Sequence, residues 1–192
     1  MAEVLLFHHA QGLTPGVLGL AQELRDAGHV VHTPDLYEGH VFDTLDEGMG
    51  YARKAGFDVI AARGEAAASD LPAELVYVGL SLGAVPAQKL AQTRAGARGV
   101  VLLHACLPAA EFGAWPDGLP AQIHGMDADP FFAEEGGDLD AARELVAVVP
   151  TAELFLYEGD RHLFTDSGLP EYDEAAAGVV RERVRRFLEA AA

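Results

Sequence analysis

Short runs of consecutive apolar residues recur along the chain and alternate with segments of helical periodicity. Val4–Phe7 is the first such run, and it ends at polar residues. Because continuous apolar runs are typical of strands buried on both faces of a parallel sheet, this run predicts such a strand. Val17, Leu20 and Leu24 then follow the three- and four-residue spacing of an amphipathic helix, which ends at the next glycine.

The same alternation continues to the end of the chain. Further strands are predicted over Val30–Thr33, Leu75–Val78, Val100–Leu103, Ala121–His124 and Leu154–Tyr157. Helices are predicted as two short segments between Thr44 and Ser69, then from Gly83 to about Ala95, over Leu139–Val149 and over Tyr172–Ala190. Parallel strands need crossover helices, so this order predicts an α/β fold with a doubly wound, mainly parallel sheet of about six strands. No repeat or linker interrupts residues 1–192, and we expect a single domain.

Composition and charge exclude several classes of partner. The chain has 13 Lys and Arg against 30 Asp and Glu, a formal net charge of −17. Such a field repels phosphate backbones and anionic lipid, so we expect neither a nucleic acid nor a membrane partner. The single cysteine, Cys106, can form no internal disulfide, and no apolar run approaches the roughly 20 residues of a membrane helix. A cytoplasmic location without a signal segment is therefore expected.

A glycine-flanked serine follows the third predicted strand. The residues Gly79-Leu80-Ser81-Leu82-Gly83 lie between that strand and a helix, which is the context of a G-x-S-x-G nucleophile elbow. The glycines leave room for strand and helix to approach closely, and the sharp turn exposes the serine hydroxyl above the sheet. The same letters also fit a turn in which the serine only caps the helix, or a phosphate-binding turn of a flavodoxin-like protein.

A serine nucleophile needs a histidine that takes its proton and a carboxylate that orients the histidine. In the α/β-hydrolase fold these residues follow the serine in the order acid, then histidine, each on a loop after a later strand. Asp129 lies 48 residues after Ser81, and His162 a further 33 residues on, about one strand–helix unit each. Asp127 is an alternative acid, and Asp160 is most simply a solvated loop acid.

Taken together, these motifs resemble the dienelactone hydrolase family. The resemblance extends over essentially the whole chain and rests on the elbow, Asp129-Pro130-Phe131, His162-Leu163-Phe164 and Thr33-Pro34-Asp35-Leu36-Tyr37. It implies a minimal α/β-hydrolase without a cap domain and a catalytic triad of Ser81, Asp129 and His162. The family places its triad acid two residues before a phenylalanine, which selects Asp129 over Asp127.

Two departures from the family bear on the substrate. The namesake enzymes have cysteine at the elbow centre and an acidic residue after the first strand, where this chain has Ser81 and, approximately, His9. They also bind a substrate carboxylate with arginine, one of which is expected about four residues after the triad histidine, where this chain has Asp166. Arg161 is the only arginine near that position in sequence, so neutral esters or lactones are expected to be better substrates than carboxylate-bearing ones.

The oxyanion hole is predicted to combine the backbone N–H of Leu82 with that of Ala10 or Gln11, from the loop after the first strand. The same loop contains His8 and His9, which can also be explained as part of an ordinary strand-to-helix turn with no role in catalysis. His9 is nevertheless a candidate contact of Ser81. Residues expected near the crevice, and candidates for a substrate pocket, are His9, Tyr37, Trp115, Phe131 and Phe164.

No cofactor is required by this chemistry, and no histidine or cysteine spacing typical of a metal site occurs. Cys106 is most simply a small buried hydrophobe. The sequence therefore predicts a serine hydrolase that cleaves a small-molecule ester or lactone through an acyl-enzyme. The alternative is a non-catalytic protein that keeps the fold and binds a small ligand or a protein partner.

Overall fold

One sheet of six parallel strands forms the centre of the computed structural model, which describes residues 1–192. The strand order is β2-β1-β3-β4-β5-β6, and every neighbouring pair is parallel. The strands are β1 (Glu3–Phe7), β2 (Val30–His32), β3 (Val76–Leu80), β4 (Gly99–Leu103), β5 (Ala121–Met126) and β6 (Ala152–Tyr157). Each predicted strand is present, with small shifts at its ends.

The apolar runs form strands because both faces of the sheet are covered. Strands β3, β4 and β5 are buried at every residue, and β3 and β4 accordingly show no alternation of polar and apolar residues. In β5 the polar Gln122 and His124 are buried as well. The edge strands β2 and β6 are partly exposed. All strands point the same way, so the loops at their carboxyl ends gather along one edge of the sheet.

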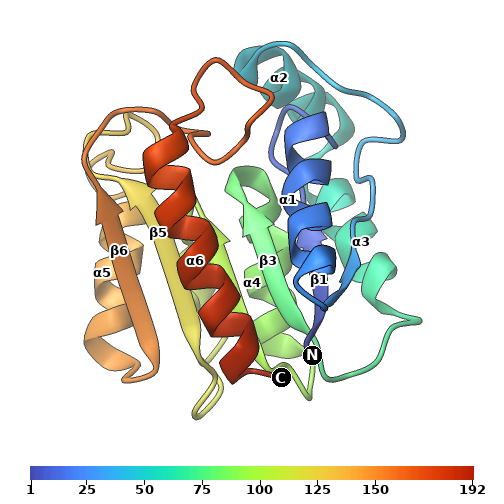
Figure 1. The fold of residues 1–192 in the computed structure, drawn as a ribbon, viewed down its shortest axis with the longest axis vertical. Coiled ribbons are helices and arrows are strands. Elements are labelled where there is room, and N and C mark those ends of the chain that lie inside the picture. The colour runs from blue at the N-terminus through green and yellow to red at the C-terminus, as the bar shows by residue number, and fades with distance from the viewer.

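Helices cover the two faces of the sheet in separate layers (Figure 1). Helices α1 (Pro15–Asp26) and α6 (Glu174–Ala190) pack on one face, where 19 buried hydrophobic residues form a cluster. The opposite face, with a cluster of 25 such residues, is covered by α3 (Phe57–Ala68), α4 (Ala84–Thr93) and α5 (Asp138–Val148). Two hydrophobic layers on one twisted sheet are the doubly wound arrangement that the sequence predicts.

The segment between Thr44 and Ser69 forms two helices, as its glycines predict. Helix α2 (Leu45–Ala55) ends at Gly56, whose φ of 97° favours glycine, and α3 starts directly after it. The last helix begins at Glu174, two residues later than predicted, because the Asp173 side chain accepts a hydrogen bond from the N–H of Ala176 and caps it.

The carboxyl edge of the sheet has no inserted cap. Between β4 and β5 the chain forms only a short 3₁₀ turn, η2 (Ala109–Glu111), and loops. None of the helices combines the length and the apolar composition that crossing a bilayer requires.

Candidate active site

Ser81 lies in a strained turn between β3 and α4. Its φ is 49°, in the left-handed region, and it starts the short 3₁₀ turn η1 (Ser81–Gly83). A Cβ atom on Gly79 would lie 2.4 Å from the carbonyl oxygen of Gly83, and one on Gly83 would lie 2.4 Å from that of Phe7. Only glycine fits at these two positions, which accounts physically for the G-x-S-x-G pattern.

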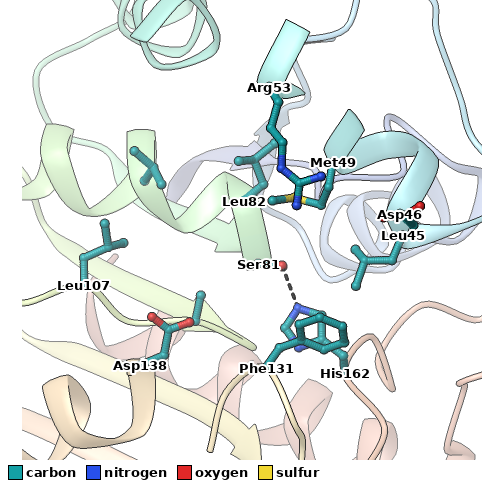
Figure 2. A pocket seen from close by; sticks show the side chains of 12 residues that line it. Leu45, Asp46, Met49, Arg53, Ser81, Leu82, Leu107, Phe131, Asp138 and His162 are labelled. Atoms are coloured by element: carbon teal, nitrogen blue, oxygen red, sulfur yellow. Dashed lines mark hydrogen bonds between the residues drawn. The ribbon is translucent and has the colours of Figure 1, made fainter. Parts of the chain in front are cut away.

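Three side chains from three loops, those of Ser81, His162 and Asp129, meet at the carboxyl edge of the sheet. Figure 2 shows the first two and the hydrogen bond between them. Ser81 Oγ is 2.8 Å from Nε2 of His162, in the loop after β6. Nδ1 of the same ring is 2.7 Å from Oδ2 of Asp129, in the loop after β5. Asp129 is fully buried and His162 nearly so.

The partners of His162 fix its tautomer. A carboxylate only accepts hydrogen bonds, so Nδ1–H of His162 donates to Asp129 and Nε2 accepts from the Ser81 hydroxyl. The second oxygen of Asp129 accepts the N–H of Phe131. Asp127 instead accepts the N–H of Gly159 and forms no hydrogen bond or ion pair with His162. The structure therefore brings together the acid, base and serine that the sequence singles out.

In the loop after β1, the two predicted oxyanion donors differ in their hydrogen bonding. The N–H of Gln11 donates to Nδ1 of His9 at 3.2 Å, whereas no protein group accepts the N–H of Ala10. The candidate oxyanion donors are therefore the backbone N–H of Ala10 and that of Leu82, which directly follows the serine. Gln11, the other predicted donor, already has a partner.

His9 forms no hydrogen bond with Ser81, because both of its ring nitrogens have other partners. It is fully buried, and its Nε2 donates to Oδ2 of Asp166 at 2.7 Å. The same oxygen accepts from Thr14 Oγ1, which is also the N-cap of α1. Burial disfavours a charged carboxylate, but the hydrogen bonds from His9 and Thr14 outweigh it and lower the pKa of Asp166. The position where the resemblance suggests arginine therefore holds a buried structural carboxylate.

A pocket of about 430 Å³ opens in front of Ser81 and His162. Apolar side chains form most of its wall, and Asp46, Arg53 and Asp138 bring charge to it (Figure 2). Its lining residues are Leu45, Asp46, Met49, Arg53, Ser81, Leu82, Val85, Ala105, Leu107, Phe131, Asp138 and His162. An apolar pocket with a few convergent polar groups is typical of small-molecule sites.

Only Phe131 of the predicted pocket residues lines this pocket, where its ring lies 4.9 Å from that of His162. Tyr37 is fully buried and packs against Tyr51, and Phe164 is buried edge-on against His104. Trp115 packs at the margin of the core and donates to the carbonyl oxygen of Leu119. His9, Tyr37 and Phe164 are therefore part of the interior packing, and Trp115 lies near the amino end of β5, away from the carboxyl edge of the sheet. The assignment of these four residues to the pocket is wrong.

Sequence reasoning missed the contribution of α2 and α5. Leu45, Met49 and Arg53 project from α2 into the pocket, and Asp138 is the first residue of α5. Arg53, 28 positions before Ser81, is an arginine of the pocket that sequence reasoning did not identify. Arg161 donates to the carbonyl oxygen of Tyr172 and does not line it. The sequence signal for this contribution is the four-residue spacing of Leu45, Met49 and Arg53, which places all three on one face of a helix.

Neither a metal site nor a second nucleophile is evident near the serine. The structure brings together no group of three or more His, Cys, Asp or Glu side chains that could hold a metal ion. Cys106 is buried, and burial raises the pKa of its thiol to about 12, which keeps it neutral near pH 7.

Comparison with solved structures supports the class of fold that this site suggests. A dienelactone hydrolase-like promiscuous phosphotriesterase from metagenomic libraries superposes with a TM-score of 0.75 at 21% identity, covering 99% of this chain and 86% of its own. A cold-adapted esterase from an Arctic intertidal metagenomic library gives a TM-score of 0.64 at 17% identity, covering 97% of this chain and 82% of its own. The fold is that of a minimal α/β-hydrolase without a cap.

The family follows from the sequence match. Residues 1–192 match the dienelactone hydrolase family, and the chain belongs to it. A search among curated proteins found no match. Membership supports a hydrolase that acts on small molecules, in agreement with the pocket.

Proposed function

We propose that the protein is a serine hydrolase that cleaves small carboxylic esters or lactones through an acyl-enzyme on Ser81. The observation that carries the proposal is the hydrogen-bonded series from Ser81 Oγ through His162 to buried Asp129. A turn that only caps a helix or binds phosphate has no need of a neutral imidazole and a carboxylate aligned behind its serine.

The reaction follows from the hydrogen-bond donors and acceptors of the site. Ser81 Oγ attacks the substrate carbonyl carbon and passes its proton to Nε2 of His162, while Asp129 stabilises the imidazolium that forms. The N–H groups of Leu82 and Ala10 hold the oxyanion. The alcohol leaves with the proton from His162, and water then attacks the acyl-enzyme by the same route. No step of this scheme calls for a cofactor.

Active-site labelling tests the proposal directly. A fluorophosphonate probe forms a covalent bond with an activated serine, so we expect it to label Ser81, identified by mass spectrometry of the digested protein. Ser81→Ala should lose labelling and also turnover of p-nitrophenyl acetate, by about 10⁴-fold or more. Circular dichroism should show the same fold in both proteins.

The rival function is a non-catalytic binder of the same fold. Folded wild-type protein that neither labels nor turns over short esters would favour that binder. Turnover that survives Ser81→Ala would assign the activity to another group.

A further inference from the structure

Asp138 is an acidic side chain of the pocket that the proposed reaction does not use. It begins α5 and lines the pocket together with Ser81 and His162, and Figure 2 shows its carboxylate directed into the space in front of them. A substrate whose carbonyl group reaches Ser81 must therefore lie next to the Asp138 carboxylate.

No cationic side chain pairs with Asp138. The ion pair of His162 is made with Asp129, and Arg53, on the other side of the pocket, is not within ion-pairing distance of Asp138. The backbone N–H of Cys106 lies near the Asp138 carboxylate and acts to lower its pKa, but no side chain donates a hydrogen bond to that carboxylate, so most of its acceptor capacity is unused. An unpaired carboxylate in an apolar wall is costly, so this residue is a candidate ligand-binding group.

The surroundings of Asp138 favour a positive partner. Ala105 and Leu107 belong to the same wall, and Phe131 presents a partly exposed aromatic ring to the same pocket. A carboxylate and an aromatic face together attract ammonium groups. The net charge of −17 also favours the approach of cations over anions.

We propose that Asp138 determines specificity, its carboxylate binding a cationic group of the ester while Ser81 attacks the carbonyl carbon. The proposal rests on the esterase function proposed above and names its substrate class as ammonium-bearing esters. A structural role is the alternative, because an acidic residue in the first turn of a helix also stabilises the helix.

The charge of Asp138 depends on its neighbours. Burial raises its pKa to about 6, His162 and the N–H of Cys106 act to lower it, and Asp129 acts to raise it. Asp46 and Arg53 face the same pocket from α2. The carboxylate therefore gains its full charge only above about pH 6, and a preference for cations should appear over the same range.

The experiment compares esters that differ only in charge. The first pair is the p-nitrophenyl ester of γ-trimethylammoniobutyrate and its isostere with carbon in place of the ammonium nitrogen. The second pair, acetylcholine and its carbon isostere, carries the charge on the alcohol half. For wild type we expect the ratio of kcat/KM, cationic over neutral, to be about tenfold or more in at least one pair at pH 7.5. The pair that shows the preference tells which half of the ester Asp138 contacts.

Two variants separate specificity from structure. Asp138→Asn should lower that ratio about tenfold and make it independent of pH, while in wild type the ratio rises as pH increases through about 6. Protonation of His162 affects both esters of a pair equally and cancels from the ratio. Asp140→Asn, which removes one charge from the same helix outside the pocket, should keep the wild-type ratio.

Each outcome bears on one proposal only. If wild type turns over no member of either pair, the esterase function itself fails. If neutral esters react but no cation preference exists, or if Asp138→Asn retains it, the specificity role is wrong. A lower melting temperature of Asp138→Asn with an unchanged ratio would assign Asp138 to helix stability alone.

Discussion

Asp127 and Asp129 lie in the same loop after β5, but their carboxylates have different partners. Asp129 accepts from His162, and Asp127 accepts from the backbone of Gly159. Asp129→Asn should lower kcat for short aryl esters by about 10³–10⁴, because an amide in that position favours the wrong tautomer of His162. Asp127→Asn is the matched control and should lose little. Steady-state kinetics on both variants decides the assignment, and the reverse order would move the triad acid to Asp127.

A single residue, Arg53, also changes the expected preference of the enzyme for neutral over anionic substrates. It lines the pocket but is exposed to solvent, so its attraction for an anion is weaker than that of a buried arginine. The preference for neutral over carboxylate-bearing substrates, which the sequence predicts, should therefore be modest. We expect Arg53→Gln to lower the kcat/KM ratio of a ring-carboxylated butyrolactone to the plain lactone by about threefold to fivefold.

Proton release at pH 7.5 measures both lactones, and Arg161→Gln is the control because Arg161 does not line the pocket. An unchanged ratio in Arg53→Gln would show that Arg53 does not contact the substrate anion.

At the scale of elements, the close approach of β1, β3 and α4 makes the elbow possible. A Cβ atom on Gly83 would lie 2.4 Å from the carbonyl oxygen of Phe7, which belongs to the backbone of a central strand and cannot move aside. Gly83→Ala should therefore destabilise the fold by about 1–3 kcal/mol and also displace Ser81. The melting temperature should fall by roughly 2–4 °C per kcal/mol.

Gly50→Ala supplies the matched control for this prediction. Gly50 is inside α2, and a Cβ atom there would meet nothing within 4 Å. Alanine in a helix interior gains roughly 0.5–1 kcal/mol over glycine, so the melting temperature should rise. A stable, active Gly83→Ala variant would contradict the tight packing described for the elbow.

The order of strands and helices also explains why the triad could be predicted from the sequence and the rest of the pocket could not. Parallel strands end at one edge, so residues just after Leu80, Met126 and Tyr157 had to lie near one another, and these residues include the triad. Arg53 and Asp138 come from helices whose placement over the pocket depends on tertiary packing. Tyr37 and Phe164 were misplaced because an aromatic residue after a strand looks the same in sequence whether it lines a pocket or fills the core.

At the scale of the whole molecule, three buried histidines connect folding to pH. Burial lowers the pKa of His8 to about 4, that of His124 to about 3, and that of His104 well below its usual value. In the unfolded chain each histidine takes up a proton near pH 6.5. The unfolded state therefore binds more protons than the folded state below that pH, and stability falls as pH falls through this range.

Two carboxylates, the partly buried Asp138 and the buried Asp166, modify this acid sensitivity in opposite directions. Asp138 has a raised pKa of about 6, so the folded state gains a proton there and offsets part of the histidine effect. The pKa of Asp166 is lowered, so its contribution to stability is present above its unfolded value and is lost at lower pH, as pH falls through the folded value. The histidines should dominate between about pH 6.5 and pH 4, because three groups act together there.

His124 offers the cleanest test of this linkage. Its ring is fully buried and contacts the Tyr157 hydroxyl and the Gln122 side chain, both of which glutamine can also reach. His124→Gln removes one protonation site of the unfolded chain without adding a charge to the core. The free energy of unfolding should then depend less steeply on pH, by about 1.4 kcal/mol per pH unit between about pH 5.5 and pH 4. Urea titrations of both proteins at several pH values measure the two slopes.

Equal slopes for the two proteins would mean that His124 is already protonated in the folded protein. As an internal control, the difference between the slopes should vanish above about pH 7.5, where neither the folded nor the unfolded state binds the proton.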